Sequence, residues 1–360
     1  MKTVLVLLAI SAVFVGCGSG LNRSGSGDSG DHPIVQTPQY VYVLNQSDLT
    51  ISQFGVGATG VLSPLSASPV TTGNYPRAMT MDATRSYVYV ANAGDDTISQ
   101  FKIGADGALA PIALPISTSS PFALVFSPDG ASLYSVDVNG SSVSQFSVGL
   151  DGVLSYVSTA ASGAFPMNMA FAPSGKFAYV ANDGDMTVSQ YSVGSDGSLS
   201  PLTPATVPTV GCPDGPMEST RVGSAEFLYL LSCSSSLVEA FSIGADGQLT
   251  SKSTTPTGAV PQGMAIQGSN LYVANSGDGT VSQFSIQADG SLAAFAQPTV
   301  AAGVSPETLA IDRSGKFAYV TDFNSDTVLQ YSIGADGSLS PMSGFAVSTG
   351  MSPTKVIVKY

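Results

Sequence analysis

Few side chains in this sequence could do acid–base or metal chemistry. The single histidine among 360 residues, His32, lies in a Gly/Ser-rich stretch outside any patterned segment. A His-rich metal site is therefore excluded, and a His-based catalytic triad is not expected in the folded region. Carboxyl groups remain, since 25 Asp and Glu stand against 12 Lys and Arg, a formal net charge of −13. Phosphate contacts need clustered basic residues, so this balance argues against nucleic-acid binding.

Aspartates recur at similar places along the chain, just after a repeated strand pattern. One interpretation is turn chemistry, because Asp caps tight turns through its own backbone. The other is a face that holds a ligand or a hard cation, which takes several carboxylate and carbonyl oxygens. The spacing does not match a calcium loop with a terminal Glu, so we predict no metal site and no cofactor. The aspartates that are candidates for facing a ligand are Asp95, Asp183, Asp185, Asp278 and Asp322.

A repeat organises the chain around these side chains. A strand pattern with tyrosine at its middle occurs seven times, at intervals of 43 to 50 residues. After it come a segment of the type Ser-Gln-Phe, a tight turn such as Ala105-Asp106-Gly107, and in most repeats an alternating apolar segment that begins with Pro. Short β-branched and aromatic runs bounded by Gly, Asp and Pro are typical of strands joined by hairpins. The central tyrosines are Tyr42, Tyr89, Tyr134, Tyr179, Tyr229, Tyr272 and Tyr319.

Four strands in each unit predict one all-β domain over residues 40–360, a seven-bladed β-propeller with four-stranded antiparallel blades. The first unit opens on its tyrosine strand at Tyr40, whereas a lone Pro-led strand from Pro353 to Val358 ends the sequence. We expect this strand to complete the N-terminal blade and close the ring, which pairs two strand edges. The glutamine of the Ser-Gln-Phe/Tyr segments recurs in six of the seven units, and we expect it to bond to backbone as a buried amide.

The first 39 residues differ from the repeats. Residues 1–16 combine Lys2 with an apolar run from Val4 to Val15 that is too short to span a bilayer, and they predict a signal peptide. The end of this run, Phe14 to Cys17, resembles the processing box of bacterial lipoproteins, which implies lipidation of Cys17. Ordinary secretion is the alternative. Residues 17–39 predict a flexible tether. We expect a monomer in the cell envelope, extracytoplasmic and bound to a membrane through its N-terminal lipid, at the outer membrane if the host is Gram-negative.

The repeats resemble those of the lactonase-type seven-bladed propellers, the family that includes propeller 6-phosphogluconolactonases, and also the YVTN repeats of surface-layer propellers. The resemblance covers nearly the whole chain after residue 39. It implies a ligand site around the central channel, on the face where the loops before the Pro-led strands meet the loops after the tyrosine strands. The matching segments are YVANAGDDTISQFKIGADGALAPI, from Tyr89 to Ile112, and FAYVANDGDMTVSQYSVGSDGSLSPL, from Phe177 to Leu202.

The resemblance also implies a catalytic set, of which this chain has little. Lactonising members share a His, an Arg after one Pro, and a Glu and an Arg beyond the asparagine of the tyrosine strand. Arg77 matches the Arg after Pro, whereas Ala93 stands where the Glu is expected. Lactone chemistry needs a placed acid or base. The candidates that the sequence offers beside the loop aspartates are Glu218 and Glu307.

The fifth repeat departs from the others. Its Pro-led segment carries Glu218, Ser219 and Arg221, which indicates either an internal ion pair or a polar cluster that faces a ligand. Cys212 and Cys233 belong to this repeat. A hairpin centred near residues 224–225 places Cys233 opposite Pro216, within reach of Cys212 folding back. We predict a Cys212–Cys233 disulfide, which an oxidising compartment favours. Free thiols are the alternative.

Two functions compete. The sequence favours a binding or interaction scaffold with a degenerate active site, whose loop face takes a protein or small-ligand partner. The alternative is a lactone hydrolase of the 6-phosphogluconolactonase type, a carboxylic-ester hydrolase that acts on a sugar-derived lactone. In that case Arg77 binds an anionic substrate and Glu307 or Glu218 is the base. The missing His and Glu–Arg pair favour the scaffold.

Overall fold

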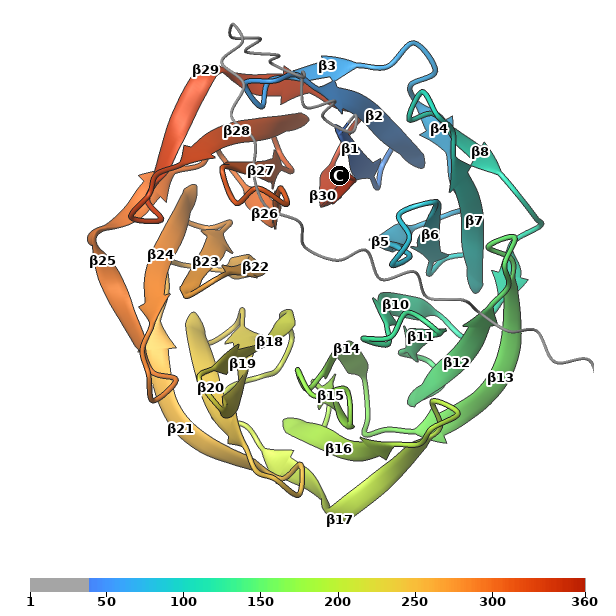
Figure 1. The fold of residues 1–360 in the computed structure, drawn as a ribbon, viewed down its shortest axis with the longest axis vertical. Helices are drawn as coiled ribbons and strands as arrows, with labels where there is room; N and C mark the ends of the chain where they lie inside the picture. Colours follow the sequence, from blue (N-terminus) through green and yellow to red (C-terminus); the bar gives the residue numbers. More distant parts are fainter. Residues whose placement is uncertain (1–38, 360) are drawn as a thin grey trace, which may run out of the picture. The chain divides into compact units, whose positions relative to one another are not determined.

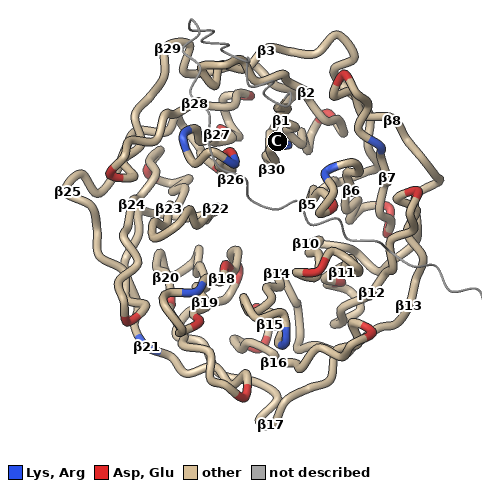
Figure 2. Tube along the Cα trace, viewed as in Figure 1, with Lys and Arg blue, Asp and Glu red and all other residues tan. Residues whose placement is uncertain are grey.

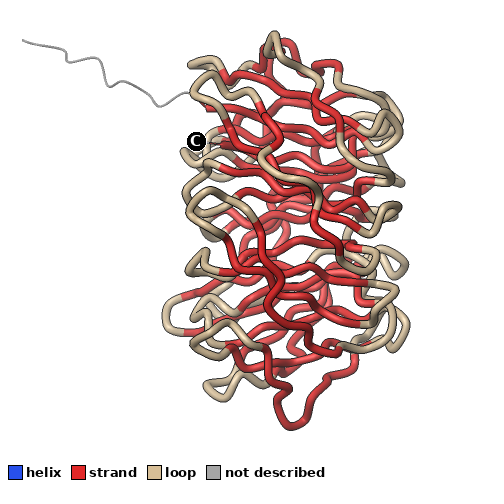
Figure 3. The backbone as a smooth tube through the Cα atoms, turned by 90° about the vertical axis from the view of Figure 1, so that its right-hand side faces the viewer, coloured by secondary structure: helices blue, strands red, loops and turns tan. Residues whose placement is uncertain are grey.

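The computed structural model describes residues 39–359, which form seven antiparallel sheets arranged in a ring (Figure 1). The expected seven-bladed all-β propeller is confirmed. The expected signal peptide, lipidated Cys17 and almost all of the tether lie outside the described residues. Seen edge-on, the strands run between two faces made of loops (Figure 3). Residues 39–359 contain no helix, and so none that is long and apolar enough to cross a membrane.

Each blade begins at the channel with a strand that most often starts at proline. These inner strands are β30 (Pro353–Lys359), β5 (Pro76–Met81), β10 (Pro121–Phe126), β14 (Pro166–Phe171), β18 (Met217–Val222), β22 (Pro261–Gln267) and β26 (Pro306–Ile311). The tyrosine strands come second in each blade. They are β1 (Gln39–Asn45), β6 (Tyr87–Asn92), β11 (Ser132–Asp137), β15 (Phe177–Asn182), β19 (Ala225–Ser232), β23 (Asn270–Asn275) and β27 (Phe317–Asp322).

The third strand of each blade carries the Ser-Gln-Phe-type segment. The third strands are β2 (Thr50–Val56), β7 (Thr97–Ile103), β12 (Ser142–Val148), β16 (Thr187–Val193), β20 (Leu237–Ile243), β24 (Thr280–Ile286) and β28 (Thr327–Ile333). The outer strand is broken into two pieces in the first two blades. The outer strands are β3 (Leu62–Pro64) with β4 (Val70–Thr71), β8 (Leu109–Pro111) with β9 (Ile116–Ser117), β13 (Leu154–Ala161), β17 (Leu199–Pro208), β21 (Leu249–Pro256), β25 (Leu292–Ala301) and β29 (Leu339–Ser348).

The ring closes as expected, through the two ends of the described chain. Strand β30 pairs antiparallel with β1, so that Val358 lies opposite Val41 and Val356 opposite Val43. The first blade therefore takes its inner strand from the C-terminus, in the sheet order β3-β2-β1-β30. This pairing covers strand edges that would otherwise be left without hydrogen-bond partners.

The recurring tyrosines and turn glycines are hydrogen-bond partners across neighbouring blades. Each central tyrosine is fully buried, and its hydroxyl donates to the carbonyl oxygen of the glycine in the next blade's tight turn. The glycine has a positive φ, and at Gly107 a Cβ atom would lie 2.2 Å from the ring of Tyr40, so glycine is required there. The pairs are Tyr42–Gly107, Tyr89–Gly152, Tyr134–Gly197, Tyr179–Gly247, Tyr229–Gly290, Tyr272–Gly337 and Tyr319–Gly60.

The recurring glutamines also join the blades, which confirms their expected bonds to backbone. The side-chain oxygen of Gln53, for example, accepts the backbone N–H of Leu109 at 2.7 Å, where the next blade's outer strand begins. The same contact recurs from Gln100 to Leu154, Gln190 to Leu249, Gln283 to Leu339 and Gln330 to Leu62. These buried amides are thus satisfied, and each gives the neighbouring blade's outer strand a hydrogen-bond partner.

Candidate functional site in the central channel

A cavity of about 590 Å³ lies at the centre of the ring, and residues from all seven inner strands line it. The loops that lead into these strands share one face with the loops that follow the tyrosine strands. The backbone N–H of Ala93 donates to Tyr75 and that of Asp183 donates to Phe165, at 3.1 and 3.0 Å. We call this the mouth face. In Figure 2, acidic and basic residues both occur on strands around the channel, among them β5, β18 and β26.

Arg77 lies at the mouth of the channel, held by two aromatic rings. It follows the proline that begins β5, so its side chain is placed where the strand leaves the mouth face. The guanidinium carbon lies 4.3 Å from the ring centre of Phe122, on β10, and 5.3 Å from that of Tyr75. Tyr75 has a φ of 50°, an uncommon conformation for a non-glycine residue. Cation–π contacts of this kind fix a guanidinium without neutralising its charge.

Glu307 occupies the equivalent place on β26, where it also follows the leading proline and lines the cavity. Burial raises the pKa of this carboxyl to about 7, although the positive charge of Arg77 acts in the opposite direction. The inner strand β30 lies between β5 and β26 in the ring (Figure 1). A carboxyl with this pKa exchanges protons readily at neutral pH, as a general base must.

Glu218 lies deeper in the channel than the sequence indicates. On β18, Glu218 lies opposite the central tyrosine of its blade, Tyr229, just as Ala170 lies opposite Tyr179 in the preceding blade. We call this depth in the channel the tyrosine level. At this level Glu218 is the single charged side chain among the seven inner strands. Burial raises its pKa to about 7, while the positive charge of Lys355 opposes that shift. The other residues at this level are Thr80, Val125, Ala265, Ala310 and Ile357.

Lys355 is the second cation that lines the cavity, and the sequence did not single it out. It belongs to β30, two residues nearer the mouth than Ile357. Burial lowers the pKa of its ammonium group and the charge of Glu218 acts against that change. The sequence could have indicated it, because Lys355 belongs to the Pro-led strand that closes the ring and is the second residue after its proline.

Four of the five loop aspartates accept hydrogen bonds from the backbone of the mouth face. The carboxylate of Asp95 accepts the backbone N–H of Asn74 at 2.6 Å, which holds the pKa of Asp95 below its usual range. Asp185 and Asp278 make the matching contacts with Ala164 and Ala259, at 2.6 Å each. Asp322 is buried and accepts the N–H groups of Val304 and Ser305. These contacts support the turn-chemistry interpretation.

Asp183 differs from the other four candidates. Burial and the negative charge of Asp214 both raise its pKa. Asp214 lines the cavity, so two like charges approach each other on the fourth and fifth blades near the mouth. Within residues 39–359, no three His, Cys, Asp or Glu side chains lie close enough together to hold a metal ion.

The chain is similar in sequence to one known protein family. A sequence model described as "Lactonase, 7-bladed beta-propeller" matches residues 23–126, 117–214 and 227–356. These segments span most of the chain. The protein belongs to this lactonase family. A search of curated proteins gave no significant match.

Solved structures share the fold of this lactonase-family chain. A protein assigned as a 6-phosphogluconolactonase from Bacteroides fragilis has a TM-score of 0.78 and 19% sequence identity, covering 92% of this chain and 100% of its own. The periplasmic gluconolactonase PpgL of Pseudomonas aeruginosa has a TM-score of 0.74 and 20% identity, with 89% and 99% covered. At such identities the likeness extends to the fold, and the residues of the channel must be argued from this chain.

The fifth blade of this lactonase-family propeller differs from the others in the place of its inner strand. Met217 follows Pro216 as Arg77 follows Pro76, but it is buried and pairs with Leu230, as Met79 pairs with Val90. The reason is the register. β5 has a bulge after its proline, whereas β18 pairs without one, and the ladder places Pro216 opposite Leu231, one step deeper than Pro76 opposite Asn92. Every residue of β18 therefore lies nearer the far end of the channel than proline counting suggests.

The same register explains the cysteines. Both Cys212 and Cys233 are free thiols, so the expected disulfide is not formed in the structure. Extending the ladder of β18 and β19 places Asp214, not Pro216, opposite Cys233, and Asp214 accepts the backbone N–H of Cys233 at 2.7 Å. The Cys233 thiol lines the cavity and points towards the side-chain oxygen of Gln262, 3.9 Å away. Burial raises the pKa of this thiol.

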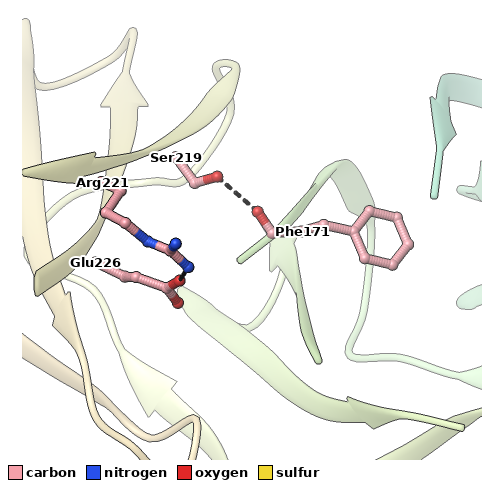
Figure 4. A network of polar contacts seen from close by, with 4 residues as sticks. All are labelled: Phe171, Ser219, Arg221 and Glu226. Atoms are coloured by element: carbon pink, nitrogen blue, oxygen red, sulfur yellow. Dashed lines mark hydrogen bonds and ion pairs between the residues drawn. The ribbon is translucent and has the colours of Figure 1, made fainter. Parts of the chain in front are cut away.

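The sequence left two interpretations of the polar residues on β18, an internal ion pair or a polar cluster that faces a ligand, and the structure contains features of both. Arg221 forms an ion pair with Glu226, in the same blade (Figure 4). Ser219 donates a hydrogen bond of 2.6 Å to the carbonyl oxygen of Phe171, in the neighbouring blade (Figure 4). Glu218 and Ser219 both line the cavity, whereas Arg221 and Glu226 do not. The fifth blade thus contains both the internal ion pair and polar groups in the channel.

Proposed function

We propose that this lactonase-family protein hydrolyses a sugar-derived lactone in its central channel, with Glu307 as the general base and Arg77 as the group that polarises the lactone carbonyl. The observation that carries the proposal is the placement of these two side chains at the mouth of one cavity, on strands that flank β30. A cavity of about 590 Å³ is large enough for a single sugar ring.

The chemistry requires one proton acceptor and one site of positive charge. The ionised carboxylate of Glu307 removes a proton from water, and the resulting hydroxide attacks the carbonyl carbon of the lactone. The guanidinium of Arg77 stabilises the negative charge that develops on the carbonyl oxygen. The tetrahedral intermediate then breaks its bond to the ring oxygen, which takes the proton from Glu307. The products are a carboxylic acid and a hydroxyl group on the same open chain, with water consumed.

Two features support Glu307 over Glu218 as the base. Glu307 shares the mouth with Arg77, so both can act on one carbonyl group, whereas Glu218 lies deeper among apolar residues. A pKa of about 7 also keeps a large fraction of Glu307 ionised at neutral pH and still basic enough to take a proton. The His and the Glu–Arg pair shared by the resembling enzymes have no equivalent here, so the proposed set is this chain's own.

A binding function at the mouth face is the second candidate, and one observation favours it. Several large apolar side chains in the loops of this face are exposed to solvent, and apolar side chains that gather on one face can mark an interaction site. A protein partner that covers them would leave the channel without a chemical role. The exposed residues are Tyr75, Phe165, Met186, Val210, Val260, Val304 and Met351.

We place the protein outside the cytoplasm, held to a membrane by a lipid on Cys17. The apolar run and the lipoprotein-like box in residues 1–17 support this placement. Radiolabelled palmitate added to cells that express the full chain should label the protein, and Cys17→Ser should abolish the label. Secretion of an unlabelled wild-type protein would contradict the proposal.

A panel of sugar lactones tests the hydrolase proposal. We expect turnover above the spontaneous rate, and a loss of at least about 100-fold in kcat for both Arg77→Ala and Glu307→Gln. Arg221→Ala and Glu226→Gln are matched controls, because their ion pair lies outside the cavity lining, and both should keep full activity. Turnover that survives Glu307→Gln would exclude this carboxyl as the base. Absence of turnover with every lactone would favour the binding function.

A further inference from the structure

The charges that line the channel limit what it can bind. Three carboxyl groups, those of Asp214, Glu218 and Glu307, face the cavity, against two cations, Arg77 and Lys355. Each glutamate is acted on by one of the two cations. Among the residues that line the cavity, the positive charges are therefore already matched by negative ones. The lining offers no surplus of positive charge to a ligand.

A phosphate group would meet unfavourable conditions in this cavity. A buried dianion needs charged or strongly donating partners to replace its water, and here it would compete with the glutamates for Arg77 and Lys355. Its negative charge would also raise the proton affinity of Glu307 and Glu218. A protonated Glu307 cannot act as a base. The phosphate and the proposed catalytic state are therefore incompatible.

Neutral polar groups also line the cavity. The amides of Asn168 and Gln262 and the hydroxyl of Thr308 line the cavity between the charged residues. Amides and hydroxyls both donate and accept, and carboxylates accept, which suits the hydroxyl groups of a sugar ring. Below them, Met169 and Met264 give the cavity apolar walls.

Resting on the lactonase function proposed above, we infer that the channel takes an uncharged, polyhydroxylated lactone and excludes its phosphorylated counterpart, and that Glu218 and Glu307 impose this selection.

Binding of a non-hydrolysable analogue tests the inference separately from catalysis. The probes are gluconolactam and its 6-phosphate, titrated by calorimetry at pH 7.5 into the wild-type protein. We expect the neutral lactam to bind at least about 10-fold more tightly than the phosphate, a difference of about 1.4 kcal/mol. Equal or tighter binding of the phosphate, or no binding of either probe, would overturn the inference. Binding of the lactam without turnover of the lactone would refute the hydrolase alone.

Two isosteric variants show whether the glutamates cause the selection. Glu218→Gln and Glu307→Gln each remove one negative charge, and each should bind the phosphorylated lactam about 10-fold more tightly than the wild type does. In both variants the ratio of phosphate to lactam affinity should rise about 10-fold, and thermal melts show that the variants are folded. Glu226→Gln, whose carboxyl pairs with Arg221, should leave both affinities unchanged. Unchanged phosphate binding in both channel variants would contradict the assignment.

Discussion

Tyr319 donates a hydrogen bond of 2.9 Å to the carbonyl oxygen of Gly60, 259 residues earlier in the chain. This contact joins the last blade to the first, and six others like it join the remaining neighbours. Each is made by a buried hydroxyl group inside the seam between two blades. A buried hydroxyl without its partner is unfavourable, so these contacts specify how the blades fit as well as stabilise them.

Replacing Tyr319 by Phe should lower the free energy of unfolding by about 1 kcal/mol, because the Gly60 carbonyl oxygen loses its donor. Urea denaturation measures the change. Tyr156→Phe is the matched control, since Tyr156 is exposed on an outer strand and should change stability by less than about 0.5 kcal/mol. Equal losses in the two variants would show that the seam contact has no special role.

Deleting residues 353–360 should unfold the protein or make it aggregate. The deletion removes β30, the inner strand of the first blade, and exposes the edge of β1 that pairs with it. Unpaired edges of this kind recruit other strands. Light scattering and thermal melting detect the two outcomes. A truncated protein with an unchanged melting temperature would refute closure by β30.

The pH dependence of hydrolysis should follow Glu307. Its pKa is about 7 and its ionised form is the base, so kcat/KM should fall about tenfold for each pH unit below 7 and level off above it. Arg77→Ala removes the charge that lowers this pKa, so any residual activity should show a midpoint at higher pH. Arg221→Ala should leave the profile where it is. If the midpoint does not move in Arg77→Ala, the charge of Arg77 does not act on the carboxyl of Glu307.

Glu218→Gln should stabilise the protein more at pH 8 than at pH 4. Burial raises the pKa of Glu218 to about 7 in the folded state, above its unfolded value. The stability that its protonated form contributes is present below the unfolded pKa, and it is lost as the pH rises through 7. The loss reaches at most about 3 kcal/mol, and glutamine does not undergo it.

Thermal melts of the wild type and Glu218→Gln, measured between pH 4 and pH 8, test this expectation. The difference in melting temperature should grow with pH. For Glu226→Gln, which alters an ion pair away from the cavity, the difference should be smaller and nearly constant across this range. A constant difference for Glu218→Gln would mean that its carboxyl is solvated in the folded protein.

The fold could be predicted because its determinants are local and repeated. The tyrosine strand and the turn glycine each occupy a fixed place in every unit, and Tyr42 and Gly107 show why both must recur together. The leading proline keeps its place in all units but the fifth. Arg77 and Glu307 could be placed at the channel for the same reason, since a proline marks where their strands begin.

The depth of Glu218 could not be predicted from the same pattern. It depends on the register of β18, which has no bulge after its proline and pairs that proline one step deeper along the neighbouring strand than β5 does. The hairpin of β18 and β19 is also centred one residue earlier than expected, so Asp214 and not Pro216 lies opposite Cys233. The depth of Glu218 and the partner of Cys233 both follow from this register, in the repeat with the longest interval.

The missing bulge in β18 has a consequence for how such a channel can change over evolutionary time. The fifth blade keeps its tyrosine contacts to both neighbours and its glutamine contact to the fourth blade, although the register of its inner strand differs. We therefore expect that a change of register alone can bring a carboxyl such as Glu218 to a level where the other blades have uncharged side chains. On this scaffold, ligand specificity can then change through the register of one inner strand, without a substitution among the residues that line the channel.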